Sequence, residues 1–157
     1  MSRWRPHTTG ILVGGLVLIL VAMVVSYMYT NFQPTTEVRL GSGVFRMQLA
    51  TTDQQREQGL SGVERLASNG GLLMVYPTEG IWGIWMKDMK IPLDIIWMNN
   101  KKEVIYIVTG ASPDIGMSKT FKPEKPARYV LEVPAGTVKN AGITIGATAV
   151  FTIVEDK

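Results

Sequence analysis

The chain lacks cysteine altogether, and its only histidine is His7, close to the N-terminus. Without cysteine there are no disulfides, no thiolate metal sites and no cysteine nucleophile. Without a histidine after residue 7, residues 37–157 hold no Ser-His-Asp triad, no histidine general base and none of the usual zinc sites. These two absences remove most common hydrolase chemistries, and we expect no metal and no cofactor.

Charged residues are also missing from a long N-terminal stretch. Residues 6–36 contain no Asp, Glu, Lys or Arg, and residues 11–25 are all apolar or glycine. At about 1.5 Å per residue, residues 10–29 are long enough to cross a bilayer, and Arg3 and Arg5 place the N-terminus in the cytoplasm. The predicted parts are a cytoplasmic tail at 1–9, a transmembrane signal-anchor helix at 10–29, a polar tether at 30–37 and an extracytoplasmic domain at 38–157.

A cleaved signal peptide is the alternative for this N-terminal segment. Fifteen strongly apolar residues is the upper limit for the core of a signal peptide, and Val24-Val25-Ser26 matches the cleavage pattern poorly. On either interpretation the domain lies outside the cytoplasm, anchored in the inner membrane or released in a secreted form.

The exported part carries little net charge. Residues 37–157 hold all thirteen acids and all but two of the sixteen lysines and arginines, which leaves one net positive charge. No basic patch is evident, so nucleic acid is not an expected partner.

Short runs with period-two or continuous apolar character predict a mainly β domain. Asn99-Asn100 suits a tight hairpin, since asparagine tolerates positive φ. The expected strands are 44–49, 72–76, 81–86, 93–98, 103–109, 128–133 and 148–154, with a turn at 77–80. Such a set indicates a compact antiparallel β-sandwich or barrel.

Helices are expected in two short pieces only. Thr52 with Gln55 and Ser61 with Glu64 each fit a capping box, which predicts helical turns at 53–59 and 62–67. Residues 110–127 contain three prolines and no periodicity, and a loop of that length is often functional.

The most informative motif runs from Trp85 to Trp97. It embeds Lys87, Asp88 and Asp94 among aromatic, methionine and branched aliphatic side chains. Burying an unpaired charge costs several kcal/mol, so charged residues among apolar side chains are expected to form ion pairs or to have a function. The alternative for Asp94 is a purely structural carboxylate that accepts amides of the preceding turn or pairs with a lysine. The alternative for all the charged residues together is a network of salt bridges that closes one end of the barrel.

The order of motifs resembles a known family. Gln58-Gly59-Leu60, Gly70-Gly71-Leu72-Leu73-Met74, the motif from Trp85 to Trp97, and Tyr129-Val130-Leu131-Glu132 together resemble domain of unknown function 192, over about residues 38–154. The resemblance implies a compact, mainly β-sandwich fold, frequently exported, with no assigned activity. Many members carry a cysteine where Met117 or Ser118 stands and an aspartate where Ala147 stands, so roles resting on those residues do not transfer.

We expect a membrane-tethered binding or accessory module rather than an enzyme. The candidate ligand-binding residues are Trp85, Lys87, Asp88, Asp94 and Glu132, with the 110–127 loop as a lid over a small-molecule or glycan ligand. A factor that docks onto an envelope protein complex is the alternative, which predicts an exposed apolar patch without a pocket. A carboxylate-dependent hydrolase acting on envelope glycans is the third, since paired carboxylates hydrolyse glycosidic bonds.

Overall fold

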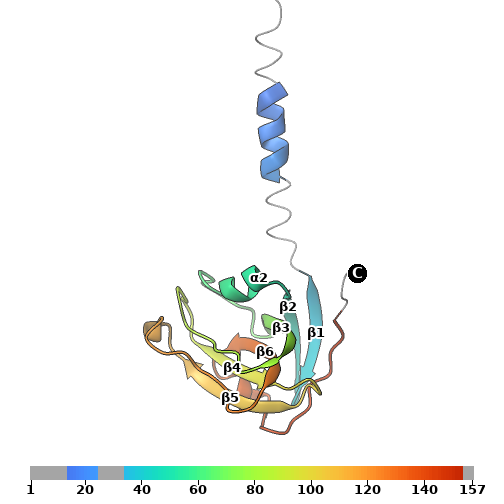
Figure 1. Cartoon of the computed structure of the whole chain (residues 1–157), viewed down its shortest axis with the longest axis vertical. Coiled ribbons are helices and arrows are strands. Elements are labelled where there is room, and N and C mark those ends of the chain that lie inside the picture. The colour runs from blue at the N-terminus through green and yellow to red at the C-terminus, as the bar shows by residue number, and fades with distance from the viewer. Residues whose placement is uncertain (1–13, 25–33, 154–157) are drawn as a thin grey trace, which may run out of the picture. The chain divides into compact units, whose positions relative to one another are not determined.

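The computed structural model describes residues 14–24 and 34–153, in two compact units divided between Gln33 and Pro34. Residues 14–24 are helical (Figure 1). Within the described residues, no helix is both long enough and apolar enough to cross a membrane. The remainder of the predicted anchor, residues 10–13 and 25–29, lies outside the described residues.

The second unit is built on one curved, six-stranded mixed sheet in the order β1-β2-β3-β6-β4-β5 (Figure 1). Its strands are β1 Thr35–Leu40, β2 Gly43–Ala50, β3 Gly70–Gly80, β4 Leu93–Met98, β5 Val104–Ala111 and β6 Ala127–Pro134. The helices are α2 Asp53–Gln58, α3 Thr137–Asn140 and the 3-10 turn η1 Pro113–Ile115. β2 and β3 are parallel, and the other neighbouring strands are antiparallel.

The mainly β class is confirmed, but the sheet is mixed and not the expected all-antiparallel sandwich or barrel. The described strands form a single sheet, and the chain enters β3 beside β2 through α2 and the turns that follow, which gives a parallel pair. Residues 146–150 then bond to both edges: Val150 exchanges backbone hydrogen bonds with Arg39 of β1, and the amide of Gly146 donates to Val104 of β5. The C-terminal segment thus connects the two edge strands.

Apolar residues cover both faces of the sheet. One buried cluster includes Phe45, Leu73 and Ile96, and a second, on the opposite face, includes Met74 and Trp97. Because β4 and β6 lie inside the sheet with cover on both sides, β4 is buried at every position. A strand in that position is expected to be a nearly continuous apolar run, and β4 is one apart from Asp94.

Several local predictions are confirmed. β4 has the predicted bounds, β4 and β5 pair as the predicted hairpin, and β2 alternates between buried and exposed positions. The capping box of α2 forms as predicted, with the Thr52 side chain accepting from the amide of Gln55.

The predicted helix at 62–67 is wrong, because its capping residue has another partner. The hydroxyl of Ser61 donates to the carbonyl of Lys87 at 2.8 Å, and residues 63–67 have no regular structure. The predicted turn at 77–80 is also wrong: β3 continues through Pro77 to Gly80, across a register shift. Proline tolerates such a bulge because it has no amide to leave unpaired.

Two predicted strands are not strands in the structure. Residues 81–86 are irregular, with a single bridge from Ile84 to Phe121, while Trp82 stacks on Tyr76 at 4.2 Å between ring centroids. The described part of 148–154 forms only isolated bridges at Thr148 and Val150. In both segments several apolar side chains pack in the core, but the backbone does not form a continuous series of β-sheet hydrogen bonds. β1 was not anticipated, and it begins inside the stretch predicted as a tether.

Candidate functional site

Asp94 lies in the middle of the fold and is completely buried. It shares a sheet face with Ile96 and Val133. Its two carboxylate oxygens each accept a backbone amide at 2.8 Å, one from Gly110 at the end of β5 and one from Val138 in α3. Gly136 gives α3 no side-chain cap, so Asp94 supplies from another strand the acceptor that a helix start requires.

Glu132 lies on the opposite face of the same sheet. It pairs across the strands with Leu72 and Ile95, which belong to the second apolar cluster. The side chain is 4% exposed, and its Oε2 atom has no hydrogen-bond partner among the described residues. Burial without a compensating charge raises the pKa of Glu132 to about 8, so this carboxyl group is largely protonated at neutral pH.

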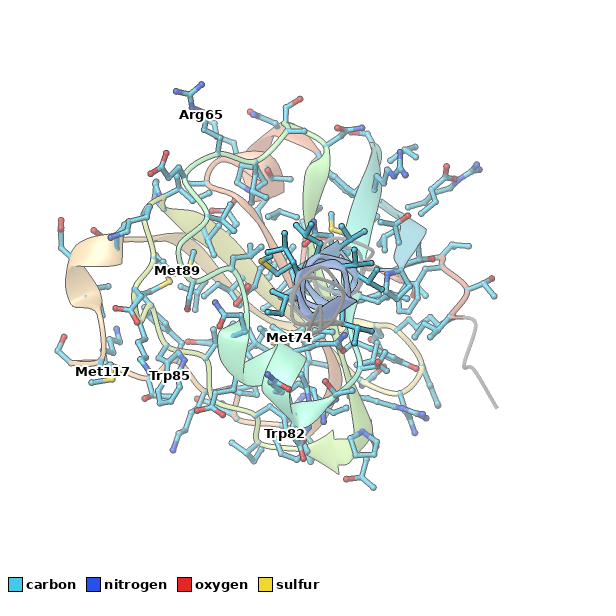
Figure 2. The ribbon with its side chains drawn as sticks, turned by 90° about the horizontal axis from the view of Figure 1, so that it is seen from above. Arg65, Met74, Trp82, Trp85, Met89 and Met117 are labelled. Carbon is cyan, nitrogen blue, oxygen red and sulfur yellow. The ribbon has the colours of Figure 1, made fainter. Side chains whose placement is uncertain are left out.

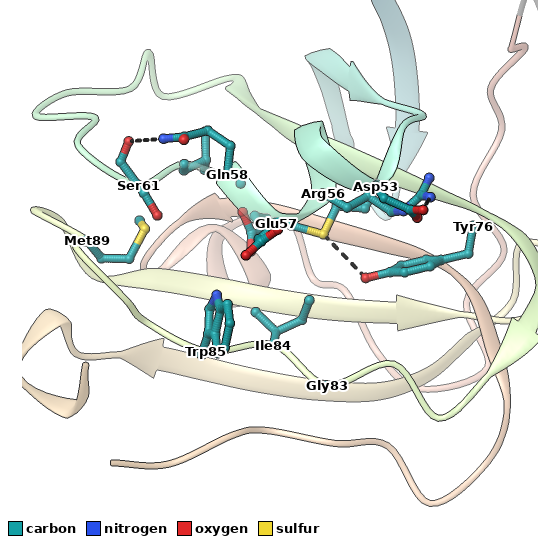
Figure 3. A pocket seen from close by; sticks show the side chains of 14 residues that line it. Asp53, Arg56, Glu57, Gln58, Ser61, Tyr76, Gly83, Ile84, Trp85 and Met89 are labelled. Atoms are coloured by element: carbon teal, nitrogen blue, oxygen red, sulfur yellow. Dashed lines mark hydrogen bonds and ion pairs between the residues drawn. The ribbon is translucent and has the colours of Figure 1, made fainter. Parts of the chain in front are cut away.

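A pocket of about 310 Å³ opens above Glu132, between α2 and the loop that follows β3. Figure 3 shows Glu57 of α2 facing Ile84 and Trp85 across it, with Tyr76 near one end and Met89 near the other. The remaining lining residues are Asp53, Arg56, Gln58, Gly59, Leu60, Ser61, Met74, Gly83 and Glu132.

Gly59 sets how closely the chain passes over Glu132. Its φ of 53° and ψ of −132° suit glycine only, and a Cβ there would lie 3.8 Å from Oε2 of Glu132 and 3.4 Å from Cε of Met74. The turn after α2 therefore lies directly against the floor of the pocket, and a side chain at residue 59 would narrow it.

Tyr76 and Arg56 form the far wall. The hydroxyl of Tyr76 donates to the sulfur of Met74 at 3.8 Å, as the dashed line in Figure 3 marks. Burial raises the pKa of Tyr76 to about 12; the Arg56 guanidinium opposes this shift, and the charge of Glu132 adds to it. The hydroxyl consequently stays protonated.

The structure brings together only part of the predicted site. Trp85 lies on the rim, 41% exposed, and Glu132 lies on the floor. Lys87 and Asp88 line a neighbouring open hollow of about 330 Å³ beside α2. Asp94 faces away from both hollows, and its partners are amides of Gly110 and α3, not of the preceding turn.

Lys87 and Asp88 hold the pocket together through their backbone. The carbonyl of Lys87 accepts the Ser61 hydroxyl, and the carbonyl of Asp88 accepts the amide of Gly62 at 2.9 Å. Asp88 has a φ of 55°, which lets the loop turn back towards α2. The contacts fix the loop and the turn after α2 against each other.

Sequence reasoning missed Met74, Tyr76 and the residues of α2 as pocket lining. The Gln58-Gly59-Leu60 motif could have indicated them. A glycine directly after a capped helix allows the backbone there to pass close to neighbouring residues. The 110–127 loop, expected as a lid, contributes no residue to the described lining, although Gly116 accepts the amide of Met86.

Comparison with known proteins places the chain among uncharacterised relatives. The model of domain of unknown function 192, described as an uncharacterized ACR, matches residues 35–151. A UPF0127 protein of Thermococcus kodakarensis is 26% identical over 114 residues, 71% of this chain and 68% of that protein. A UPF0127 protein of Thermococcus gammatolerans is 28% identical over 113 residues, 71% of this chain and 69% of that protein.

Two solved structures share the fold. One, from Sinorhizobium meliloti and described as a candidate transcription regulator, has a TM-score of 0.72 and 28% identity, covering 76% of this chain and 95% of that one. The other, a protein of unknown function from Novosphingobium aromaticivorans, has a TM-score of 0.68 and 27% identity, covering 75% and 84%.

Proposed function

The chain belongs to the domain of unknown function 192 family, and we propose that it is a binding module for a small ligand held over Glu132. The observation that carries the proposal is the unpartnered Oε2 of Glu132 in a pocket wall. A buried polar atom without a hydrogen-bond partner lowers the free energy of unfolding by about 1–3 kcal/mol, so an unpartnered glutamate in a central strand suggests a functional role. A bound ligand supplies the missing hydrogen bond.

The pocket has the character of a small-molecule site. Its volume of about 310 Å³ lies at the lower end of ligand pockets and equals that of about ten waters, which suits a ligand of about ten non-hydrogen atoms. Met74, Ile84 and Met89 give it apolar surface, and Glu132 gives it a polar group that fixes orientation. This mixture is typical of binding pockets.

The hydrogen bonds of the two hydroxyl groups in the lining, those of Ser61 and Tyr76, favour a binding site over a catalytic site. The Ser61 hydroxyl is bonded to the Lys87 carbonyl, and the Tyr76 hydroxyl is held protonated by the raised pKa of its phenol. Each hydroxyl donates to an acceptor that is not a base, the Lys87 carbonyl for Ser61 and the Met74 sulfur for Tyr76, so neither is activated as a nucleophile in this arrangement.

The proposal is tested on the full chain by following backbone amides with NMR during titration with a fragment panel. The panel holds amines, alcohols, amides and carboxylates of about ten non-hydrogen atoms. We expect at least one class to shift the amides of Gly59 and Trp85 saturably, and to lose this effect in Glu132→Leu. Glu124→Gln, which alters an exposed acid outside the lining, is the matched control and should bind as the parent does. A panel that moves neither amide would overturn the proposal.

We also propose that the module is held at a membrane by residues 10–29, with its N-terminus inside the cell. The support is the uncharged apolar run at 11–25 and the two preceding arginines, Arg3 and Arg5. Alkaline extraction of native membranes should leave the full chain in the pellet, and its release into the supernatant would contradict the tether.

A further inference from the structure

The charges around the pocket are unbalanced in the described structure. Its ionisable side chains are Asp53, Arg56 and Glu57 of α2, Tyr76 of β3 and Glu132 of β6. The loop from β3 to β4 adds no charged side chain to the lining: Lys87 and Asp88 line the neighbouring hollow, and Lys90 is exposed and lines neither.

Arg56, the single cation of the described lining, is already engaged. One of its guanidinium nitrogens donates at 2.6 Å to the carbonyls of both Thr51 and Val75, and the other pairs with Asp53. Asp53 and Arg56 therefore neutralise each other at the far wall. The carboxyl groups of Glu57 and Glu132 are left without a cation in the lining, one on the helix above and one on the floor.

The opposite wall suits the body of an organic cation. Trp85 is 41% exposed at the rim and lines the pocket together with Ile84 and Met89, so this wall offers aromatic and apolar surface to the body of a ligand. The apolar rim continues past the pocket to Met117, which is 66% exposed and lies on the same side of the molecule in Figure 2. The hydrogen bond from Met86 to Gly116 joins the two segments.

We infer that the ligand of this pocket is an organic ammonium ion, a small primary amine. Its charged head contacts Glu132, and its apolar body lies between the thioethers of Met74 and Met89 and the ring of Trp85. The inference rests on the proposed function and names its ligand class. A neutral ligand would satisfy Oε2 of Glu132 but would leave Glu132 protonated and the carboxyl group of Glu57 without a cation, whereas an ammonium ion supplies donors and charge together.

The proton balance of this binding follows from burial. Glu132 is largely protonated at pH 7 because burial raises its pKa to about 8, and an ammonium ion binds its ionised form. Binding at pH 7 therefore releases close to one proton, and the affinity rises about eightfold between pH 7 and pH 8.5 as the ionised fraction grows. A ligand that accepts a hydrogen bond from the protonated acid has the opposite dependence.

Three probes of one shape test the inference on the full chain: 2-phenylethylamine, 2-phenylethanol and 3-phenylpropanoate. Isothermal calorimetry at pH 7 and pH 8.5, in two buffers of different ionisation enthalpy, gives each affinity and the protons released. We expect the amine to bind at least tenfold tighter than the alcohol, the carboxylate to bind weakest, and the amine alone to release a proton. In Glu132→Gln the amine should lose at least tenfold in affinity together with its pH dependence, while Glu124→Gln keeps both.

Failure of the inference and failure of the proposed function give different results. If the alcohol or the carboxylate binds as tightly as the amine at the same amides, the pocket is a ligand site but the ammonium class is wrong. If the amine binds equally to the parent and to Glu132→Gln, the amine binds elsewhere and the inference is wrong. If no probe and no member of the fragment panel binds, both proposals fall.

Discussion

Asp94 and Glu132 are carboxylic acids in adjacent strands of one sheet, one residue out of register, since Ile95 pairs with Glu132. Asp94 faces the cluster that contains Ile96, where two amides 2.8 Å away meet its two oxygens. Glu132 faces the cluster that contains Met74, where Oε2 has no described partner and a pocket lies above it. Asp94 is hydrogen-bonded at both oxygens within the fold, whereas one oxygen of Glu132 has no described partner.

The difference shows that burial alone does not tell whether a carboxyl group is hydrogen-bonded within the fold. Both side chains are under 5% exposed. The distinction lies in the partners, because a carboxylate that joins Gly110 to Val138 stabilises the packing of β5 and α3 on β4. A carboxyl group with an unpartnered oxygen lowers stability unless a ligand is bound. The two acids should therefore respond to mutation with opposite signs.

The largest expected effect is at Asp94. Asp94→Ala leaves the amides of Gly110 and Val138 unpaired, at about 1–3 kcal/mol each, so we expect a loss of about 4 kcal/mol in the free energy of unfolding at pH 7. Urea unfolding followed by circular dichroism measures it. Asp94→Asn keeps one acceptor and should lose about half as much. Glu124→Ala, at an exposed acid, should lie within about 0.5 kcal/mol of the parent, and an equally small loss at Asp94 would break the comparison.

The next effect has the opposite sign and depends on pH. Because Glu132 ionises near pH 8 in the folded state and near pH 4.5 when unfolded, the folded state binds more protons between these values, and stability falls as pH rises through them. The parent should lose about 2 kcal/mol between pH 6 and pH 8, and Glu132→Gln should remove this dependence and be the more stable of the two at pH 8.5. Denaturant midpoints across this range give the result. A parent whose stability rises with pH between 6 and 8 would show that Glu132 is ionised in the fold.

The smallest effect concerns the cover over Glu132. α2 has no buried residues, so its stability depends on the capping box at Thr52 and on the hydrogen bonds of Arg56 to Thr51 and Val75. Thr52→Ala should cost about 1 kcal/mol and increase hydrogen exchange in α2 while leaving β4 protected. Thr52→Ser retains the hydroxyl and is the matched control. Equal acceleration in α2 and β4 would mean that the cover and the sheet open together.

Much of the fold could be predicted because its signals are local. β4 is an apolar run interrupted only by Asp94, β2 is a period-two alternation, and the structure has both strands. The helix at Asp53–Gln58 follows from two side chains that bond across one turn. The wrong prediction of a helix at 62–67 has a non-local cause: the Ser61 hydroxyl has a partner 26 residues away, at Lys87, which no local pattern contains.

The candidate site was predicted only in part, for a related reason. The motif from Trp85 to Asp94 marks the right loop, and Trp85 lines the pocket. The face on which each strand residue lies depends on how strands distant in sequence pair, and that pairing places Asp94 and Glu132 on opposite sides. The contribution of Tyr76 likewise depends on β3 continuing past Val75 beneath α2.

The sequence by itself determined the chemistry that is excluded, the mainly β class, the strands with strong patterning and the family resemblance. These depend on composition and on neighbours within a few residues. Only the tertiary structure decided which buried acid has partners. Partners such as Gly110 and Val138 come from strands and helices far along the chain, and a hydrogen bond exists only where packing brings donor and acceptor within about 3 Å. For the same reason only the tertiary structure showed that Glu132, and not Asp94, faces a pocket.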